Sequence, residues 1–241
     1  MHVVNRLYEE EFDFPLRDEE PMITYAIATV PRTGSTHFAT VLWRSGVLGA
    51  PMEYPNVRTV QRIIQRLGRG NIVAYWKELK RRRTSPNGVF GYKLFVNTFE
   101  RELLPYLNPD RVIYFTRSDK AAQAVSYARA LQTDAWFAGA KELEKPIYSF
   151  EQIRGCEDAI RQQEAAWEDI FATTKTVPLR INYDDLRSDP NSVLDLVCRD
   201  LGVEPDPIVE CNVPEIERQG DAINREWIER YKHEVSKHDA P

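Results

Sequence analysis

The chain of 241 residues has only three cysteines, no Cys-x-x-Cys pair and no long apolar segment. An odd number of dispersed cysteines argues against a disulfide framework and against a zinc site. Cys156 and Cys198 fall within amphipathic helical patterns, so we expect small buried apolar side chains there. No apolar stretch approaches the roughly 20 residues of a membrane-spanning helix. The N-terminus MHVVNRLYEEEFDF lacks the basic start and apolar core of a signal peptide. We therefore expect a cytoplasmic protein without a transmembrane segment.

Positive charge is not in excess either. Lys and Arg total 32 against 37 Asp and Glu, which gives a net charge of −5 and a pI near 5.5. A nucleic-acid-binding protein needs a basic footprint for the phosphates, so this composition argues against that class. The length and an apolar fraction of 42% are compatible with one hydrophobic core. We interpret residues 1–21, which are acidic and weakly periodic, as an N-terminal arm, and residues 22–241 as a single domain.

Short apolar runs alternate with helical patterns along the rest of the chain. Strands are predicted at Ile23–Val30, Val89–Phe95, Arg111–Thr116 and Val177–Asn182. Helices are predicted at about 35–44, 57–69, 71–83, 119–137, 150–174 and 190–201, the last two with N-caps at Ser149 and Asp189. This order indicates an α/β fold with a mostly parallel sheet and helices on both faces. Ligands of such sheets bind at the carboxyl ends of the strands.

The first strand leads into the sequence PRTGSTH and then into a helix. A glycine turn at a helix N-terminus presents backbone N–H groups and the positive end of the dipole, and Arg32, Ser35 and Thr36 add donors. The loop is therefore a candidate anion site, although a capped helix start without a ligand has the same pattern. It is not a Walker A loop, because Gly34 is followed by serine where that motif has lysine.

A second candidate anion site follows the third strand, in YFTRSDKAAQAVS. Arg117 ends the strand and Ser126 lies nine residues later on the next helix, so both would face the same crevice as the first loop. Together an arginine and a serine can bind one isolated phosphate. Taken alone, a strand-terminal arginine is more often part of a surface ion pair.

These segments, with GVLGAPMEY, LRINYDDLRSDPNSVLDLVCRDLGV and ERQGDAINREWIERY, resemble a known family over residues 23–232. The chain is similar to the bacterial sulfotransferases that use 3′-phosphoadenosine 5′-phosphosulfate (PAPS), a family typified by trehalose 2-sulfotransferase. The resemblance implies a P-loop-NTPase-like central parallel sheet. It also implies transfer of the sulfuryl group of PAPS to a hydroxyl, with adenosine 3′,5′-bisphosphate as product, no metal, and a homodimer.

The resemblance also assigns roles to individual residues. The 5′-phosphosulfate would be held by the first loop, that is by Arg32, Thr33, Gly34, Ser35 and Thr36. Arg117 and Ser126 would bind the 3′-phosphate, and Arg218 and Gln219 would close over the nucleotide. Glu53, in GAPMEYPN, matches the general base of the family, and Arg32 would also stabilise charge on the leaving phosphate. His37 is a competing base, and Lys93 stays unassigned.

The acceptor is expected to be a carbohydrate or a glycolipid. His37, and the residues after Glu53, depart from the family pattern, so the acceptor need not be trehalose. Nine basic residues against one acidic residue lie between Arg58 and Arg83. They form either a solvated helix face or a surface for an anionic acceptor or membrane, and Tyr75 and Trp76 either stack on sugar or belong to the core. Two other functions remain as hypotheses: a P-loop small-molecule kinase, and a non-catalytic module that kept the nucleotide fold.

Overall fold

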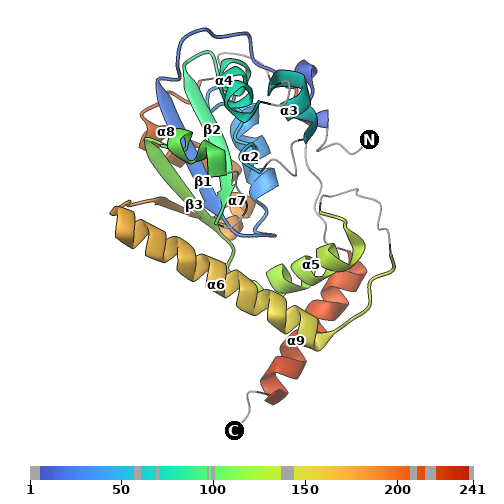
Figure 1. The fold of residues 1–241 in the computed structure, drawn as a ribbon. Coiled ribbons are helices and arrows are strands. Elements are labelled where there is room, and N and C mark those ends of the chain that lie inside the picture. The colour runs from blue at the N-terminus through green and yellow to red at the C-terminus, as the bar shows by residue number, and fades with distance from the viewer. Residues whose placement is uncertain are drawn as a thin grey trace.

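The protein is described by a computed structural model (Figure 1). The structure describes residues 6–56, 61–68, 71–96, 98, 101–136, 144–206, 211–214 and 221–238. Within these residues, no helix is both long and apolar enough to cross a membrane.

A four-stranded sheet with the order β2-β1-β3-β4 forms the centre of the fold. The strands are β1 (Ile23–Thr29), β2 (Val89–Phe95), β3 (Arg111–Thr116) and β4 (Leu179–Asn182), and all neighbours are parallel. The predicted α/β class and the parallel sheet are confirmed. The fourth strand begins two residues later than predicted, and Val177 is 94% exposed instead of adding to the sheet.

The helices follow the predicted pattern closely where the chain carries cap signals. They are α2 (Ser35–Arg44), α3 (Gln61–Gly68), α4 (Ile72–Arg83), α5 (Lys120–Thr133), α6 (Phe150–Thr174), α7 (Tyr183–Ser188), α8 (Pro190–Leu201) and α9 (Ala222–His238), with short 3-10 helices η1 (Glu10–Phe12) and η2 (Arg101–Tyr106). Ser149 and Asp189 cap α6 and α8 as expected, because each side chain accepts from the backbone N–H three residues ahead.

Some of the helices differ from the prediction or extend beyond the described residues. The predicted helix over 119–137 ends at Thr133, because Asp134 adopts a left-handed backbone conformation with φ 54° that closes the helix. Residues 57–60 and 69 of another predicted helix lie outside the described residues. The helices α7 and α9 were not predicted as separate elements.

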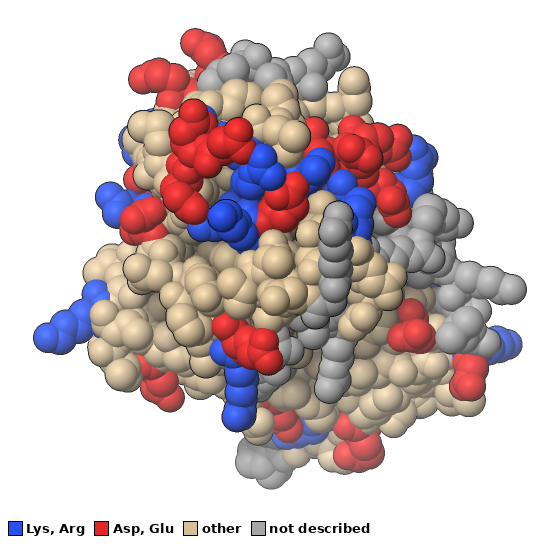
Figure 2. Space-filling model, turned by 45° about the horizontal axis from the view of Figure 1, so that its top comes forward, with Lys and Arg blue, Asp and Glu red and all other residues tan. Residues whose placement is uncertain are grey.

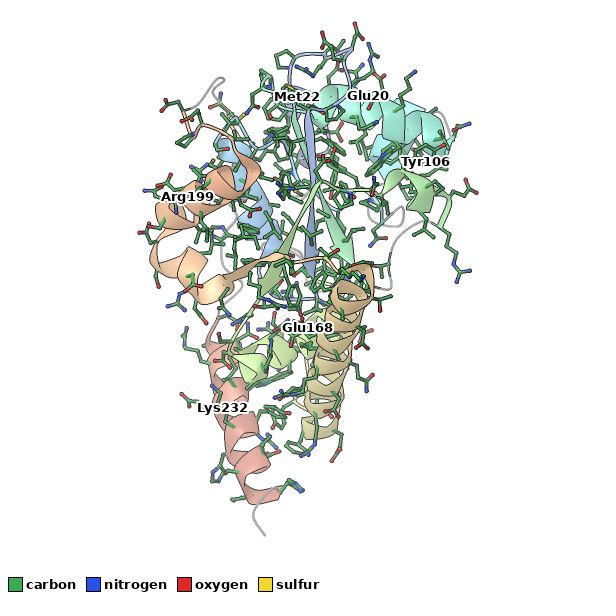
Figure 3. All side chains as sticks on the ribbon, turned by 90° about the vertical axis from the view of Figure 1, so that its left-hand side faces the viewer. Glu20, Met22, Tyr106, Glu168, Arg199 and Lys232 are labelled. Atoms are coloured by element: carbon green, nitrogen blue, oxygen red, sulfur yellow. The ribbon has the colours of Figure 1, made fainter. Side chains whose placement is uncertain are left out.

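The two faces of the sheet are covered by different helices. Tyr25 and Ile27 of β1 share a core with α2 and α8 on one face. Tyr92 of β2 contributes to a core with α3 and α4 on the other face, and Tyr114 of β3 to a core with α5, α6 and α9. In Figure 1, α5, α6 and α9 lie together at the end of the molecule opposite α3 and α4. Lys232 of α9, labelled in Figure 3, anchors this end through an ion pair of 3.2 Å to Asp119, the N-cap of α5.

The N-terminal segment packs against α3 and α4 and supplies negative charge to their basic side chains. Leu7, Tyr8 and Phe14 of this segment are buried in the core next to α4. The ion pairs that join the segment to these helices are Arg66–Asp13, Lys80–Glu20, Arg81–Asp18, Arg82–Asp13 and Arg83–Asp13. A hollow of about 690 Å³ beside these pairs is lined by both charges, and Figure 2 shows the two signs interleaved on this face. The paired basic residues of 58–83 therefore already contact acidic groups of the same chain.

Candidate functional site

The candidate residues gather where the parallel strands end. The loop after β1 leads into α2, Lys93 lies near the end of β2, Arg117 follows β3, and Tyr183 opens α7 directly after β4. Because all four strands run in one direction, these carboxyl ends meet at one edge of the sheet. The two loops that the sequence identified as anion sites therefore share one edge.

The loop after β1 turns through two residues with a left-handed backbone, Arg32 with φ 64° and Gly34 with φ 90°. Gly34 is the N-cap of α2 and contributes no side chain to cap the helix. A Cβ at this position would lie 2.6 Å from two ring carbons of Tyr183, so only glycine fits beneath this ring. The side-chain amide of Gln123 on α5 donates to the carbonyl of Pro31 at 2.7 Å and fixes the start of the loop. The loop is thus held from two sides.

The hydroxyl groups of the loop do not all face the same way. Thr33 is fully buried, and its Oγ1 lies 2.8 Å from Oγ1 of Thr29, so this side chain belongs to the interior. Ser35 is 5% exposed. Thr36 is partly exposed and accepts from Nζ of Lys93 at 3.1 Å. The loop can therefore meet an anion through the backbone N–H groups of the first turn of α2, which have no intrahelical partner, and through Thr36.

Three arginines converge beside this loop. Nε of Arg32 donates to Oγ of Ser126 at 2.9 Å, and Arg117 donates to the Arg32 carbonyl at 3.4 Å. Burial, followed by the positive charges of Arg117 and Arg129, lowers the pKa of Arg32 to about 10. The pKa of Arg117 is also lowered, mainly by burial, and its guanidinium lies over the ring of Tyr183 at 5.1 Å. Partly buried like charges are stabilised by an anion, so this cluster has the electrostatics of an anion site.

The same geometry joins the two candidate anion sites more closely than the sequence indicated. Arg32 was assigned to the phosphosulfate loop, and Ser126 to the 3′-phosphate. In the structure the Arg32 side chain reaches Ser126 and also donates to the carbonyl of Trp136. Thr36 is contacted by the charge of Lys93, on the neighbouring strand β2. The loop itself carries no lysine, but the fold places one beside it.

Glu53 is a second contact of the Lys93 ammonium group. Its Oε2 is 3.6 Å from Nζ of Lys93, and its Oε1 accepts from the amide of Asn56 at 2.6 Å. The Lys93 side chain is 2% exposed. Its pKa is lowered from the usual value by burial, and the nearby Glu53 carboxylate partly opposes this shift. A chain of contacts thus runs from Thr36 at the helix N-terminus through Lys93 to Glu53. The Lys93 ammonium group therefore contacts both the anion loop and the candidate base.

Other sequence-based predictions have different outcomes. Tyr75 and Trp76 are 0% and 2% exposed and belong to the core, so they offer no stacking surface for a sugar. His37 is partly buried on α2. Arg218 and Gln219 lie outside the described residues. Among the described residues, no group of three or more His, Cys, Asp or Glu is arranged to hold a metal ion.

Two residues near the site had not been singled out in the sequence. Arg129 lies three positions after Ser126 on α5, and this spacing places both residues on one helix face. The sequence therefore contained a pattern from which Arg129 could have been predicted. Arg129 pairs with Asp221 at 2.7 Å, just before α9. Tyr183 gave no such signal, because its contact with Gly34 depends on the packing of β4 next to β3.

A parallel sheet with arginines clustered at the carboxyl ends of its strands is typical of α/β proteins whose ligands bind at that edge. The model of the Stf0 sulphotransferase family matches residues 24–234. The chain belongs to the Stf0 sulphotransferase family, and it is a sulfotransferase of this enzyme family.

Curated relatives agree with this membership. The chain is 26% identical over 264 residues to trehalose 2-sulfotransferase of Mycolicibacterium smegmatis, covering 90% of this chain and 97% of the relative. It is 26% identical over 260 residues to trehalose 2-sulfotransferase of Mycobacterium tuberculosis, covering 88% and 95%. A solved sulfotransferase domain from the Synechococcus PCC 7002 olefin synthase aligns with a TM-score of 0.46 at 16% identity, covering 95% of this chain and 99% of that one.

Proposed function

We propose that this protein transfers the sulfuryl group of PAPS to a hydroxyl group of a carbohydrate or glycolipid, with Glu53 as general base. The observation that carries the proposal is the chain of contacts from Thr36 through Lys93 to Glu53, beside the arginine cluster. It brings a candidate base next to a candidate anion loop. Family membership supplies the class of reaction.

The described residues fit a donor with two separate anionic groups. Arg117 and Ser126 are suited to the 3′-phosphate, because burial lowers the pKa of Arg117 and of the neighbouring Arg32, and a bound anion would stabilise both charges. The backbone N–H groups at the N-terminus of α2, with Thr36, are suited to the 5′-phosphosulfate. Gly34 supplies the left-handed backbone of the turn that precedes these N–H groups. Arg32 belongs to the loop and its side chain contacts Ser126. Arg218 and Gln219 complete the proposed donor site from the family resemblance alone.

When bound, PAPS supplies an activated sulfuryl group whose bond to the bridging oxygen breaks with the electron pair left on the bisphosphate. Glu53 takes the proton of the acceptor hydroxyl while the new sulfur–oxygen bond forms. Lys93 and Arg32 place positive charge near the transferred group and near the leaving phosphate. By analogy with phosphoryl transfer, most of the rate comes from positioning and electrostatics.

The proposed acceptor is a saccharide because the curated relatives are named as trehalose 2-sulfotransferases. At 26% identity the acceptor itself can differ. Trehalose is therefore the first compound to test, followed by other saccharides and glycolipids. The kinase hypothesis would instead require binding of ATP with magnesium, and the binding-module hypothesis would require donor binding without turnover.

Calorimetric binding of adenosine 3′,5′-bisphosphate tests the donor site. We expect binding without metal, and the Arg117→Ala variant should bind at least about thirtyfold more weakly, because a buried charged contact to phosphate is lost. Arg111→Ala is the matched control, since Arg111 is an exposed arginine at the other end of the same strand. Binding of ATP with magnesium in place of the bisphosphate would contradict the proposal and favour the kinase hypothesis.

Turnover tests the base. PAPS and trehalose are incubated with the protein, and sulfated sugar is detected by mass spectrometry. The Glu53→Gln variant should lose about a hundredfold or more of the rate while its affinity for the bisphosphate is kept. Glu168→Gln, on the surface of α6, should leave the rate unchanged. An unimpaired Glu53→Gln variant would show that Glu53 is not the base.

A further inference from the structure

Asn56 holds one of the two carboxylate oxygens of Glu53. Nδ2 of Asn56 donates to Oε1 at 2.6 Å, while Oε2 faces Nζ of Lys93 at 3.6 Å. We propose that Asn56 is a positioning residue of the transfer reaction, which fixes the Glu53 carboxylate from the side opposite Lys93. This inference rests on the proposed function, because it needs Glu53 to act as the base.

The backbone around Glu53 is already immobilised. Residues 53–56 form a turn closed by the N–H of Asn56 on the carbonyl of Glu53 at 3.2 Å. The carbonyl of Tyr54 accepts from the hydroxyl of Tyr75 at 3.2 Å, and Tyr54 is fully buried. The N–H of Lys93 donates to the carbonyl of Met52 at 2.9 Å. The turn is therefore tied to α4 and to β2, and the remaining freedom of Glu53 lies in its side chain.

A glutamate side chain has three rotatable bonds, and a base must hold one oxygen within hydrogen-bond reach of the acceptor hydroxyl. Each carboxylate oxygen has two lone pairs, so an oxygen that accepts one hydrogen bond can still take a proton. A contact on both oxygens fixes the plane of the carboxylate, which a single contact does not. Asn56 thus completes a two-sided support that Lys93 alone cannot give.

The turn offers a simpler role for Asn56, since asparagine is favoured in turns for its own hydrogen bonding. Asparagine and aspartate are close in size and both suit turns. They differ in what they present to Glu53. The asparagine amide donates a hydrogen bond to the Glu53 carboxylate, whereas an aspartate carboxylate cannot donate and repels the negative charge of Glu53. The Asn56→Asp variant therefore keeps the turn and removes the support.

The contact itself can be measured without turnover. In the ¹⁵N-correlated NMR spectrum, the side-chain amide of Asn56 is identified as the pair of peaks absent from Asn56→Ala. We expect one of its two protons to be shifted downfield by the short bond to the carboxylate, and to move upfield in Glu53→Gln. An amide pair that does not respond to Glu53→Gln would overturn the inference.

Kinetics then test the role. With PAPS and trehalose, and with water as the acceptor, Asn56→Ala should lower kcat by roughly ten- to a hundredfold, and Asn56→Asp by more, at an unchanged affinity for adenosine 3′,5′-bisphosphate. In the Glu53→Gln background the Asn56→Ala change should cost nothing further, because both substitutions remove the same function. Asn191→Ala, at an exposed position of α8, is the control variant.

The outcomes separate the two proposals. A full additional loss in the double variant, or an Asn56→Asp variant as active as wild type, would show that Asn56 serves the turn alone. Absence of turnover by the wild type with every saccharide and glycolipid tested and with water would remove the proposed function instead, whatever the NMR result. An active Glu53→Gln variant would remove Glu53 as the base, and with it the role of Asn56. A responsive amide with a non-additive cycle supports both proposals.

Discussion

The buried guanidinium of Arg83 attaches the N-terminal segment to the body of the protein. It is 0% exposed and lies over the ring of Trp43. Its nitrogens donate to three backbone carbonyls of the segment, at Leu7, Glu9 and Phe12, at 3.0 to 3.3 Å. It also forms an ion pair of 3.0 Å with Asp13, which is 6% exposed. We predict that Arg83→Met strongly destabilises the fold.

The magnitude follows from what the substitution leaves behind. Breaking a buried ion pair by removing one partner costs about 3–5 kcal/mol, because the other charge stays buried. Asp13 keeps Arg66 at 2.7 Å, which places the expected loss at the low end of that range for the pair itself. The three carbonyls lose charged donors and add to the loss. For a chain of this size, about 3–5 kcal/mol corresponds to a fall in Tm of roughly 6–20 °C.

Thermal unfolding followed by circular dichroism measures the effect. Arg81→Met is the matched control, because Arg81 is on the same helix and pairs with Asp18, which is 85% exposed. Exposed ion pairs contribute little to stability, so the control should lower Tm by much less than Arg83→Met does. Equal Tm values for the two variants would refute the argument that burial makes the contact of Arg83 strong.

Two further predictions use the backbone and the thiols. Gly34→Ala should lower Tm more than Gly202→Ala and should weaken binding of adenosine 3′,5′-bisphosphate at least tenfold. Both glycines have positive φ, but of the two only a Cβ at position 34 would face a ring at 2.6 Å. Equal effects of the two substitutions would show that the contact with Tyr183 is relieved easily. Burial raises the pKa of Cys156 to about 11, and burial followed by the charges of Asp195 and Glu204 does the same for Cys198. At pH 8 both thiols are therefore protonated. A disulfide reagent monitored by absorbance should react with them slowly in the native protein and fully in urea. Rapid reaction of these two thiols in the native protein would contradict this prediction.

The parts of the fold that local chemistry determines were predictable from the sequence. The β-branched run of β1 and the caps at Ser149 and Asp189 act over a few residues, so their patterns identify strands and helix starts directly. The end of α5 was placed too late, because the left-handed conformation of Asp134 has no strong sequence signal. The rule that ligands bind at the carboxyl ends of parallel strands directed attention to one edge of the sheet, where Arg32 contacts both Ser126 and Arg117.

Contacts that depend on long-range packing were not predictable. Three of the partners of Arg83 are backbone carbonyls, which every residue carries, so no sequence pattern marks them. The basic composition of residues 58–83 suggested an external anion as one alternative. Acidic partners of these residues lie in the N-terminal segment, as in the pair between Arg83 and Asp13, which are 70 positions apart. Charge counts along a chain say nothing about which charges meet.

Lys93 shows how the register of the sheet connects the two halves of the candidate site. β2 pairs with β1 so that Lys93 lies beside Ile27, which belongs to the core shared with α2. Because side chains alternate along a strand, Lys93 faces α2 and reaches Thr36, whereas its neighbour Tyr92 faces the core of α4. A slip of one residue would turn Lys93 to the other face. The backbone N–H of Lys93 also holds the Glu53 loop through Met52. The register of one strand pair therefore sets both the charge beside the anion loop and the position of the proposed base.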